Sequence, residues 1–428
     1  MKYFFILGTN PTLSLAELTT VINHGKFSLI QKDIAILECA EKIETSVINK
    51  IGGTIKIGSV REEIDSYAVK DILNSIANFA KPEKIETKFN FGISFYGKIK
   101  IHPVKSAPQL NPTKSVRSNS TGQEAGIPLR AELFHGVNLK VLGMKLKKLL
   151  KESEISSRWV ISKEPTLSSV VVEQNKLITD RGVEIVIIQF NKKLYIGKTL
   201  AVQPFKDLSF RDYGRPARDS HSGMLPLKLA QIMINMSGAR LNETILDPFC
   251  GSGTIVTEAM LMGYSNIIGA DLSDRAITDT RTNIEWIKKN YELPITNLNL
   301  NNIDATQISK QIKPDSVDAI ITEPYLGPQR GRFDVSKTIN ELERLYSRSL
   351  SEFNKILKPG GKIVMVWPVF CGQFKNIFLN PDLNDLKIIN PIPENLQTNI
   401  FIKTTVRQTI IYGRELQKVW REIVVLEK

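Results

Sequence analysis

The chain has 428 residues, of which 42% are apolar and 24% charged, and this composition is typical of a globular protein with two or three domains rather than one core. Its three cysteines lie far apart and have no metal-ligand or disulfide-framework spacing, so we expect neither a metal site nor a disulfide scaffold. No apolar stretch approaches the roughly 18–20 residues that span a bilayer, so we expect no membrane segment and a cytoplasmic location.

The net charge is positive and unevenly distributed. Lys and Arg total 57 against 44 Asp and Glu, which gives a formal net charge of +13. Between Lys81 and Val160 there are 15 basic and 6 acidic residues, which leaves 9 of the 13 surplus charges in that stretch. Because phosphate groups are contacted mostly by Lys and Arg, this cluster favours a polyanionic partner. The alternative is a general excess of base that only aids solubility.

Residues 1–64 are predicted to form a small ferredoxin-like domain. Apolar runs and helical spacing alternate in the order strand, helix, strand, strand, helix, strand, which suits that fold. Ser14 and Glu17 match a capping box in the first helix, and Gly52 and Gly53 end the second. The expected elements cover residues 3–7, 13–22, 27–30, 34–38, 41–49 and 54–57.

Residues 65–200 form a second predicted domain, in which the stretch 101–130 is a loop insertion. That stretch is rich in Pro, Ser, Asn and Gly and has no apolar periodicity. Helices are expected at 69–79 and 138–151. The expected strands cover residues 88–96, 170–173, 183–189 and 194–199.

Residues 201–225 are predicted to be a linker dense in Arg, Asp, Gly and Pro, and residues 226–428 form a third domain. This domain begins with an apolar helix and then alternates strands and helices at intervals typical of a parallel, doubly wound sheet. A final pair at 406–412 and 419–426 is expected to form an antiparallel edge. The parallel strands are expected at 244–246, 266–270, 298–301, 317–321 and 362–366.

The strongest motif is the turn Asp247-Pro-Phe-Cys-Gly-Ser-Gly-Thr254, which follows the first of these strands. Gly251 and Gly253 let a ligand lie against the backbone, and a helix that starts near Thr254 offers unpaired N–H donors. The turn has neither the G-x-x-x-x-G-K pattern of a phosphate loop nor the G-x-G-x-x-G pattern of a dinucleotide site. Asp247 instead places an acid before the glycines, which suits a ligand with a cationic end.

Acids also follow the second and third strands. Asp271, at the tip of the second strand, is positioned to accept hydrogen bonds from both hydroxyls of a ribose, and its spacing fits either a nicotinamide or an adenosyl cofactor. The alternative for Asp271 is a cap on the helix predicted at 272–281. Asp304 follows the third strand and is placed to hold an adenine amino group, again with a capping role as the alternative.

The fourth strand ends in Glu323-Pro-Tyr-Leu-Gly327. The exocyclic amine of a nucleobase is a poor nucleophile because its lone pair is delocalised into the ring. A carboxylate from Glu323 and a backbone carbonyl that accept its two hydrogens would aim that lone pair at a methyl donor. Pro324 fixes the backbone and removes a competing donor, and Tyr325 offers an aromatic face on which a base can stack. We therefore take Glu323, Pro324 and Tyr325 as the candidate catalytic residues.

Taken together, these four strand-tip motifs resemble those of the class I amino-methyltransferases, and in particular those of the THUMP-containing tRNA guanosine-10 N2-methyltransferases of archaea and eukaryotes. The resemblance covers most of the chain. It implies an α/β protein whose class I, Rossmann-like methyltransferase domain follows α+β ferredoxin-like and THUMP domains, with S-adenosylmethionine as cofactor. The segment from Gly214 to Pro226 also resembles the one that encloses the cofactor in this family. The implied cofactor-binding residues are Asp247, Pro248, Phe249, Gly251, Gly253, Thr254, Asp271, Leu272, Asp304 and Ala305.

The catalytic turn departs from the family pattern, which is normally Asp-Pro-Pro-Tyr-Gly. In a gapless match Glu323 replaces the Asp, Tyr325 takes the place of the second proline, and Leu326 takes the aromatic position. A glutamate reaches one methylene further than an aspartate. The departure therefore bears on how the target base is held more than on methyl transfer itself.

The resemblance implies that the THUMP domain grips tRNA and delivers the target to the catalytic pocket. The candidate RNA contacts include two arginines just after the catalytic turn. The basic helix near residue 145 is the main candidate for phosphate contact, with an ordinary solvated helix face as the alternative. A small helper protein is left open. The candidates are Lys145, Lys147, Lys148, Arg158, Lys163, Arg330 and Arg332.

Four functional hypotheses remain. The leading one is a tRNA guanine-N2 methyltransferase, and an adenine-N6 nucleic-acid methyltransferase is close to it because the same motif handles any exocyclic amine. A catalytically degenerate RNA-binding module, altered at Glu323-Pro-Tyr325, belongs to a different class. A nicotinamide oxidoreductase is the weakest, because the dinucleotide glycine pattern is absent from the sequence.

Overall fold

The computed structural model describes residues 1–82, 88–97, 133–134, 137–218, 224–328, 331, 333–372, 376–415 and 417–428. These residues form two units, one made of residues 1–57 together with 201–428 and the other of residues 58–200. The chain passes between them within β4 (Thr54–Ile64) and returns within β10 (Lys193–Val202). The predicted insertion at 101–130 lies outside the described residues. The division into ferredoxin-like, THUMP, linker and C-terminal domains stays a prediction.

A mainly parallel sheet forms the centre of the first unit, as the strand spacing predicts. Its parallel strands lie in the order β13-β12-β11-β14-β15, so the first strand in the sequence, β11, lies between β12 and β14. The order of connection reverses beside β11, and in open α/β sheets ligands bind at that point, beyond the carboxyl ends of the strands. The strands are β11 (Thr244–Asp247), β12 (Asn266–Asp271), β13 (Asn297–Asn302), β14 (Val317–Thr322) and β15 (Leu357–Phe370).

Antiparallel strands complete this sheet. The predicted final pair forms, because β18 (Ile410–Tyr412) runs antiparallel to β19 (Val419–Glu427). However, β19 is not the edge: it pairs with β15 on one side and with β17 (Lys387–Ile388) on the other. The short strand β16 (Ile377–Phe378) pairs with the end of β15.

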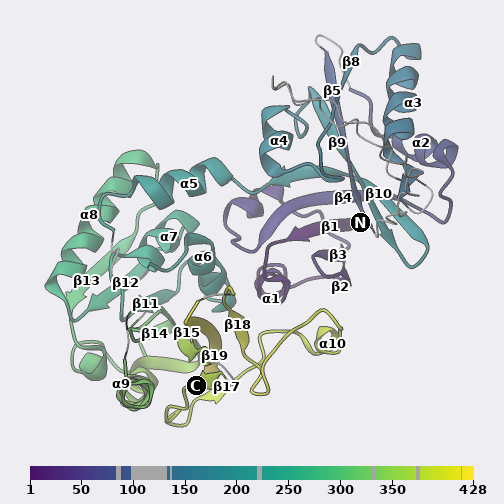
Figure 1. Cartoon of the computed structure of the whole chain (residues 1–428). Helices are drawn as coiled ribbons and strands as arrows, with labels where there is room; N and C mark the ends of the chain where they lie inside the picture. The colour runs from purple at the N-terminus through teal and green to yellow at the C-terminus, as the bar shows by residue number, and fades with distance from the viewer. Residues whose placement is uncertain are drawn as a thin grey trace, which may run out of the picture. The chain divides into compact units, whose positions relative to one another are not determined.

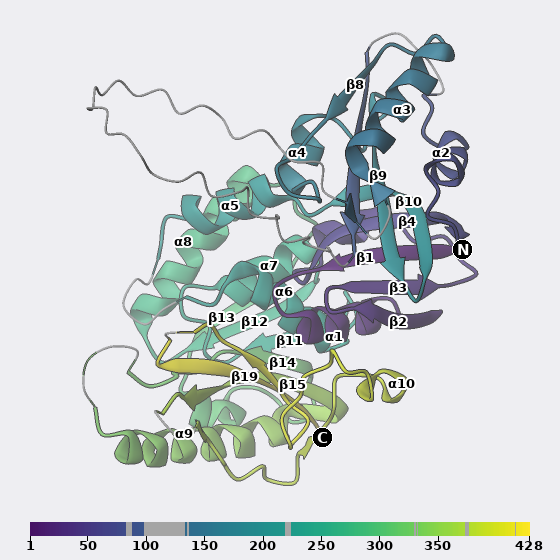
Figure 2. The same cartoon turned by 45° about the vertical axis from the view of Figure 1, so that its right-hand side comes forward.

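Helices cover both faces of the sheet (Figures 1 and 2). The helices α6 (Leu227–Met236), α7 (Thr254–Met262) and α8 (Asp274–Asn290) lie on one face, and α9 (Val335–Ile356) lies on the other beside the 3-10 helix η2 (Ala305–Lys310). A short helix, α10 (Glu394–Gln397), follows later in the chain. The core beneath α9 contains side chains three or four residues apart, as an amphipathic helix requires: Leu342, Tyr346, Leu350 and Phe353.

The first 57 residues pack against this sheet domain through helices. They form β1 (Lys2–Leu7), α1 (Pro11–Val21), β2 (Lys26–Gln31), β3 (Ile34–Glu38) and the 3-10 helix η1 (Thr45–Asn49), and α1 packs against α6. The sheet order is β2-β3-β1 with antiparallel pairing.

Two predictions in this segment are wrong. The predicted helix at 41–49 is only η1, which has no side-chain cap at its start. The predicted capping box also fails, because Asn10 caps α1. Glu17 is buried and instead accepts hydrogen bonds from the amides of Gly52 (2.8 Å) and Gly53 (2.7 Å) and from Asn235 Nδ2 (2.7 Å). The glycine pair therefore binds a carboxylate as well as ending a helical turn.

The second unit contains a mixed sheet with helices. In it β10 pairs antiparallel with β9, and β5 runs parallel to both β9 and β8. The stretch 170–173, predicted as a strand from its β-branched residues, is helical instead because Ser168 caps α4 by accepting a hydrogen bond from the amide of Val171. The elements are α2 (Val69–Ala77), β5 (Phe89–Tyr96), β6 (Leu133–Phe134), β7 (Val137–Asn138), α3 (Leu139–Glu152), β8 (Ser157–Val160), α4 (Ser169–Gln174) and β9 (Gly182–Phe190).

Within the described part of the chain, no helix combines the length and the apolar character that a bilayer crossing needs.

Candidate active site

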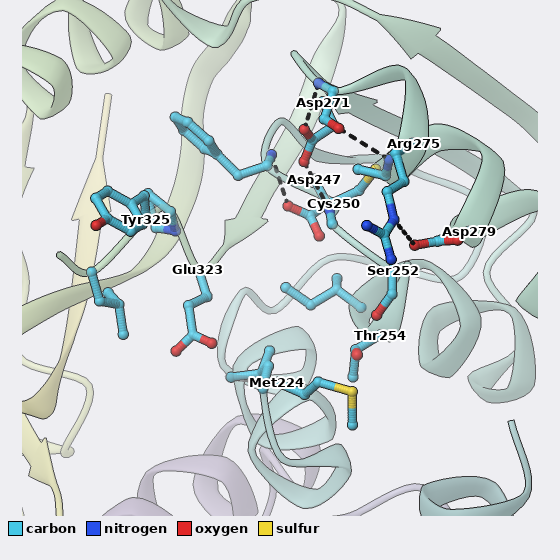
Figure 3. A pocket seen from close by; sticks show the side chains of 18 of the residues that line it. Met224, Asp247, Cys250, Ser252, Thr254, Asp271, Arg275, Asp279, Glu323 and Tyr325 are labelled. Carbon is cyan, nitrogen blue, oxygen red and sulfur yellow. Dashed lines mark hydrogen bonds and ion pairs between the residues drawn. The ribbon is translucent and has the colours of Figure 1, made fainter. Parts of the chain in front are cut away.

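The candidate active site is a cavity of about 610 Å³ beyond the carboxyl ends of β11, β12 and β14. This volume lies in the range of small-molecule and cofactor sites. Figure 3 shows Asp247 and Asp271 on the walls of the same cavity, with Glu323 and Tyr325 on another side. Of the residues predicted from the sequence, those that line it are Asp247, Phe249, Gly251, Thr254, Asp271, Glu323, Pro324 and Tyr325.

Asp247 ends β11 and is buried at the wall of the cavity. Its Oδ1 accepts hydrogen bonds from Thr322 Oγ1 (2.8 Å) and from the amide of Phe249 (3.2 Å). Burial raises the pKa of Asp247 to about 7, and the negative charges of Asp271 and Glu323 add to this rise. A cationic group in the cavity would stabilise the charged carboxylate, so Asp247 suits a positively charged ligand.

The glycine loop leaves backbone open to the cavity. Gly251 has a φ of +52°, and a Cβ atom placed on it would meet nothing within 4 Å. Gly253 has a φ of +82° and begins α7 without a side-chain cap, and a Cβ atom there would lie 2.8 Å from the side chain of Thr280. The loop therefore needs glycine at 253 for close packing, whereas at 251 glycine leaves room for a ligand.

Asp271 is fixed at the tip of β12 by two backbone amides. Its Oδ2 accepts from Gly251 N and its Oδ1 from Ser273 N, each at 2.9 Å. Each carboxylate oxygen has a second lone pair left for another donor. Ser273, not Asp271, caps α8, so the capping role considered for Asp271 is wrong. The carboxylate is held in place and has acceptor capacity for the two hydroxyls of a ribose.

The predicted catalytic turn follows β14 and is held from two directions. Tyr325 is 55% exposed at the cavity, and the hydroxyl of the buried Tyr346 donates to its carbonyl oxygen at 3.0 Å. Arg421 on β19 forms an ion pair with Glu323, with Nε 2.5 Å from Oε1 and Nη2 3.3 Å from Oε2. Sequence reasoning missed Arg421, because no local pattern connects residues that are 98 positions apart.

The other predicted cofactor-binding residues are not among the residues that line the cavity: Pro248, Gly253, Leu272, Asp304 and Ala305. The Oδ1 of Asp304 accepts from both the amide and the hydroxyl of Thr306 at 2.8 Å, so Asp304 acts as the cap of η2 that was considered as its alternative. Leu272 is exposed and Pro248 and Ala305 are buried. A part for these residues in cofactor binding stays a prediction.

The predicted RNA-binding residues that the structure describes lie in the second unit and are exposed: Lys145, Lys147, Lys148, Arg158 and Lys163. Helix α3 buries Leu142, Leu146 and Leu150 on its opposite face, so its apolar spacing turns the lysines toward solvent. Arg330 and Arg332 lie outside the described residues. RNA contact at these positions stays a prediction.

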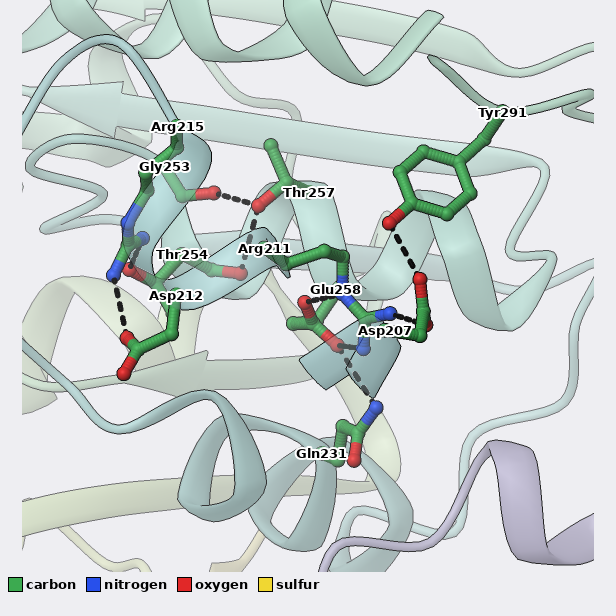
Figure 4. Close-up of polar contacts among 10 residues, drawn as sticks. All are labelled: Asp207, Arg211, Asp212, Arg215, Gln231, Gly253, Thr254, Thr257, Glu258 and Tyr291. Atoms are coloured by element: carbon green, nitrogen blue, oxygen red, sulfur yellow. Dashed lines mark hydrogen bonds and ion pairs between the residues drawn. The ribbon is translucent and has the colours of Figure 1, made fainter. Parts of the chain in front are cut away.

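The predicted linker contains a helix, α5 (Phe205–Gly214), which attaches to α7 through a buried ion pair (Figure 4). Arg211 donates from Nε to Glu258 Oε1 (2.9 Å) and from Nη2 to Oε2 (3.0 Å), and Gln231 donates to Glu258 as well (2.9 Å). Arg215 follows and donates to Thr254 Oγ1 at 2.8 Å. This network anchors the segment after α5 at the first turn of α7, beside the cavity.

Several residues that line the cavity were not predicted individually from the sequence. Arg218, Met224 and Leu225 belong to the segment expected to enclose the cofactor. Arg275 and Asp279 stand four residues apart on α8, with Arg275 Nε 3.8 Å from Asp279 Oδ2. Their signal in the sequence is their place on one helical face directly after Asp271.

Comparisons with known proteins agree with this architecture. Residues 215–370 match the RMKL-like methyltransferase domain family, and residues 72–282 match a DNA methylase family. The crystal structure of TrmN from Thermus thermophilus is similar over the whole of both chains, with a TM-score of 0.50 and 16% identity, which shows the fold. The α/β fold with a Rossmann-like methyltransferase domain is thereby confirmed.

Curated relatives share sequence over part of the chain. The tRNA (guanine(10)-N2)-dimethyltransferase of Methanothermobacter thermautotrophicus is 31% identical over 209 residues, which are 48% of this chain and 57% of that protein. The protein of the same name from Pyrococcus abyssi is 27% identical over 43% of this chain and 50% of that protein. The U6 snRNA (guanine-N(2))-methyltransferase THUMPD2 of Bos taurus is 27% identical over 32% of this chain and 24% of that protein. The alignments with the archaeal relatives thus span about half of their length.

Proposed function

We propose that this chain, a homologue of the tRNA (guanine(10)-N2)-dimethyltransferases, is an S-adenosylmethionine-dependent enzyme that methylates the N2 amine of a guanine in tRNA. The observation that carries the proposal is the convergence of Asp247, Asp271 and Glu323, from the ends of three strands, on one cavity. When bound, S-adenosylmethionine supplies a methyl group on a sulfonium cation and leaves as the neutral thioether S-adenosylhomocysteine.

The residues present fit this cofactor. The Asp271 carboxylate has acceptor capacity for both ribose hydroxyls, and the open face of Gly251 leaves room for the ligand against the backbone. Burial raises the pKa of Asp247 to about 7, so a cation beside this carboxylate would stabilise its charged form. Asp247 and Asp271 would therefore hold the cationic and ribose parts of the cofactor.

The catalytic turn would hold the target amine. Glu323 and a backbone carbonyl of the turn would accept its two hydrogens, so that the nitrogen lone pair is directed at the methyl group that the cofactor supplies. The methylated nitrogen would carry a positive charge until it releases one proton, and we propose Glu323 as the acceptor of that proton. The exposed ring of Tyr325 provides a stacking face for the flipped base.

The proposal is tested by incubating the purified protein with S-adenosylmethionine and unmodified tRNA and identifying the methylated nucleosides by mass spectrometry. N2-methylguanosine is the expected product. N6-methyladenosine would replace this proposal by the adenine alternative. Cofactor binding without any methylated nucleoside would identify a degenerate RNA-binding module.

Replacing Glu323 with alanine should lower the rate of methyl transfer by about 10²–10⁴-fold, the range typical of a lost general base. The affinity for S-adenosylmethionine should stay within about twofold, because Asp247 and Asp271 hold the cofactor. Single-turnover kinetics and calorimetry measure the two effects separately. Glu341→Ala, an exposed position on α9, serves as the control. An unchanged rate in Glu323→Ala would remove this residue from the mechanism.

The affinity for S-adenosylmethionine should depend on pH through Asp247. Its raised pKa of about 7 means that the carboxyl group of the free protein gains a proton as the pH falls through 7, and a neutral group attracts a cation less. If only the charged form binds, the dissociation constant should rise about tenfold between pH 8 and pH 6. Calorimetry across this range measures the effect. The dependence should vanish in Asp247→Asn, and its persistence there would assign it to another group.

Replacing Lys145, Lys147 and Lys148 together with glutamine should weaken tRNA binding and reduce the slope of log K against log salt by about 2–3, because each phosphate contact contributes nearly one unit. Fluorescence titration at several salt concentrations measures the slope. The matched control removes three exposed lysines elsewhere in the same unit, Lys176, Lys192 and Lys193. An equal effect in both triple variants would mean that α3 is an ordinary solvated face.

A further inference from the structure

Arg215 is a buried cation with few partners. Its side chain is only 5% exposed, and Nη1 donates to Thr254 Oγ1 at 2.8 Å (Figure 4). Within the described part of the chain, its Nε and Nη2 have no hydrogen-bond partner. The carboxylate of Asp212 is 42% exposed, and its Oδ1 lies 3.8 Å from Nη2, beyond hydrogen-bond distance. Burial lowers the pKa of Arg215, because the charged form loses its hydration, so this guanidinium would gain from an anion nearby.

The contact with Arg215 also fixes what the hydroxyl group of Thr254 can do. Thr254 is the first residue of α7, is 7% exposed and lines the cavity (Figure 3). A guanidinium only donates, so this contact takes a lone pair of Oγ1 and leaves the hydroxyl hydrogen free. Among the described residues, none accepts that hydrogen. The hydroxyl group is therefore available as a donor to a ligand in the cavity.

The surroundings of this hydroxyl group favour a negatively charged acceptor. Helix α7 begins after Gly253 without a side-chain cap, so its first turn keeps unpaired N–H groups and the positive end of the helix dipole. The guanidinium of Arg215 adds a full positive charge beside the same turn. Elsewhere on the wall, the Asp247 carboxylate suits a cation. The cavity therefore offers opposite charges at two places.

The amino-acid end of S-adenosylmethionine matches this arrangement. It carries an ammonium and a carboxylate on the same carbon atom, and the carboxylate is the only anionic group of the cofactor. Asp247 would pair with the cationic part, which leaves the carboxylate for the first turn of α7. A hydroxyl group that is itself bound by a cation is a stronger donor, because hydrogen bonds in a chain polarise one another.

We infer that Arg215 is a positioning residue that holds the Thr254 hydroxyl group as a donor to the carboxylate of the cofactor's amino-acid end. The inference rests on the proposed function and deepens it by naming the groups that recognise this end. Arg215 is not among the residues that line the cavity, so it acts through Thr254.

The test compares two ligands that differ only in the carboxylate: S-adenosylhomocysteine and its decarboxylated analogue, S-adenosyl-3-thiopropylamine. Calorimetry on the full chain gives both dissociation constants, and their ratio is the readout, because a general loss of pocket shape would weaken both ligands alike. The variants are Thr254→Val, Thr254→Ser, Arg215→Gln and the double variant Thr254→Val/Arg215→Gln. The control is Thr257→Val, which removes another nearly buried hydroxyl group from α7, at a position that does not line the cavity.

The wild-type protein should bind S-adenosylhomocysteine at least about 10-fold more tightly than the analogue. Thr254→Val should reduce this ratio about 10-fold, the effect of losing one hydrogen bond to a charged group. Thr254→Ser keeps the hydroxyl group and should change the ratio less than about threefold. Arg215→Gln should reduce the ratio about 3–10-fold, and the double variant should match Thr254→Val, because Arg215 acts only through that hydroxyl group. Thr257→Val should leave the ratio unchanged.

Two results would overturn the inference. Equal ratios in the wild-type protein and Thr254→Val would mean that this hydroxyl group does not hold the carboxylate. A further loss of the ratio in the double variant would mean that Arg215 acts on the ligand directly. Should Arg215→Gln fail to fold, Arg215→Lys replaces it in the single and double variants. Failure of the proposed function is distinct, because the wild-type protein would then bind neither ligand or form no N2-methylguanosine.

Discussion

Asp271→Asn should weaken the binding of S-adenosylmethionine about 100-fold. The substitution keeps the shape of the side chain but replaces one acceptor oxygen with an NH₂ group, which then faces a backbone donor, either Gly251 N or Ser273 N. It also removes the charge that strengthens hydrogen bonds from the ribose hydroxyls. A 100-fold change corresponds to about 2.7 kcal/mol, within the range expected for losing one or two charge-assisted hydrogen bonds.

Isothermal calorimetry with the cofactor checks this expectation. The matched control is Asp274→Asn, which removes the same charge three residues later, at an exposed position in the first turn of α8 that does not line the cavity. Its dissociation constant should stay within about threefold of the original. Equal affinities for the original protein and Asp271→Asn would refute the ribose-binding role.

Arg211→Met should lower the free energy of unfolding of the first unit by about 3–5 kcal/mol, because it leaves the Glu258 carboxylate buried without its cation. The side chains of the pair are only 5% and 1% exposed. Urea unfolding followed by tryptophan fluorescence is suited to the measurement, since Trp286, Trp367 and Trp420 all lie in this unit.

The control for this effect is an exposed ion pair. Lys288 and Glu285 are 51% and 71% exposed, so Lys288→Met should cost less than about 1 kcal/mol. The double variant Arg211→Met/Glu258→Leu should recover more than half of the loss, because no uncompensated charge remains in the core. If Arg211→Met and Lys288→Met have equal effects, the buried network does not hold α5 in place.

The parts of the fold that depend on local pattern could be predicted from the sequence. The five parallel strands could be predicted because most of them are short apolar runs that alternate with helices of their own periodicity, and the acids at the tips of four of them followed from that order. Helix α3 was found from the spacing of Leu142, Leu146 and Leu150. Short elements were less secure: the valines at 170–172 favour a strand, but one serine cap makes them helical.

The parts that depend on pairing between distant segments could not be predicted. Nothing near Glu323 indicates Arg421, because their contact exists only once β19 has paired with β15. Glu17 was misread for the same reason, since its partners include Asn235, 218 positions away. An acid that follows a parallel strand does not always line the cavity. The carboxylate of Asp304, which follows the third strand, caps η2 instead.

The position of Arg421 on β19 divides the candidate site between two kinds of strand. Asp247, Asp271 and Glu323 all belong to strands β11, β12 and β14 or their tips, whereas the guanidinium arrives with a strand that enters the sheet in the reverse direction. Val424 and Leu426 of the same strand belong to the buried core, so the strand that restrains Glu323 also helps to hold the sheet together.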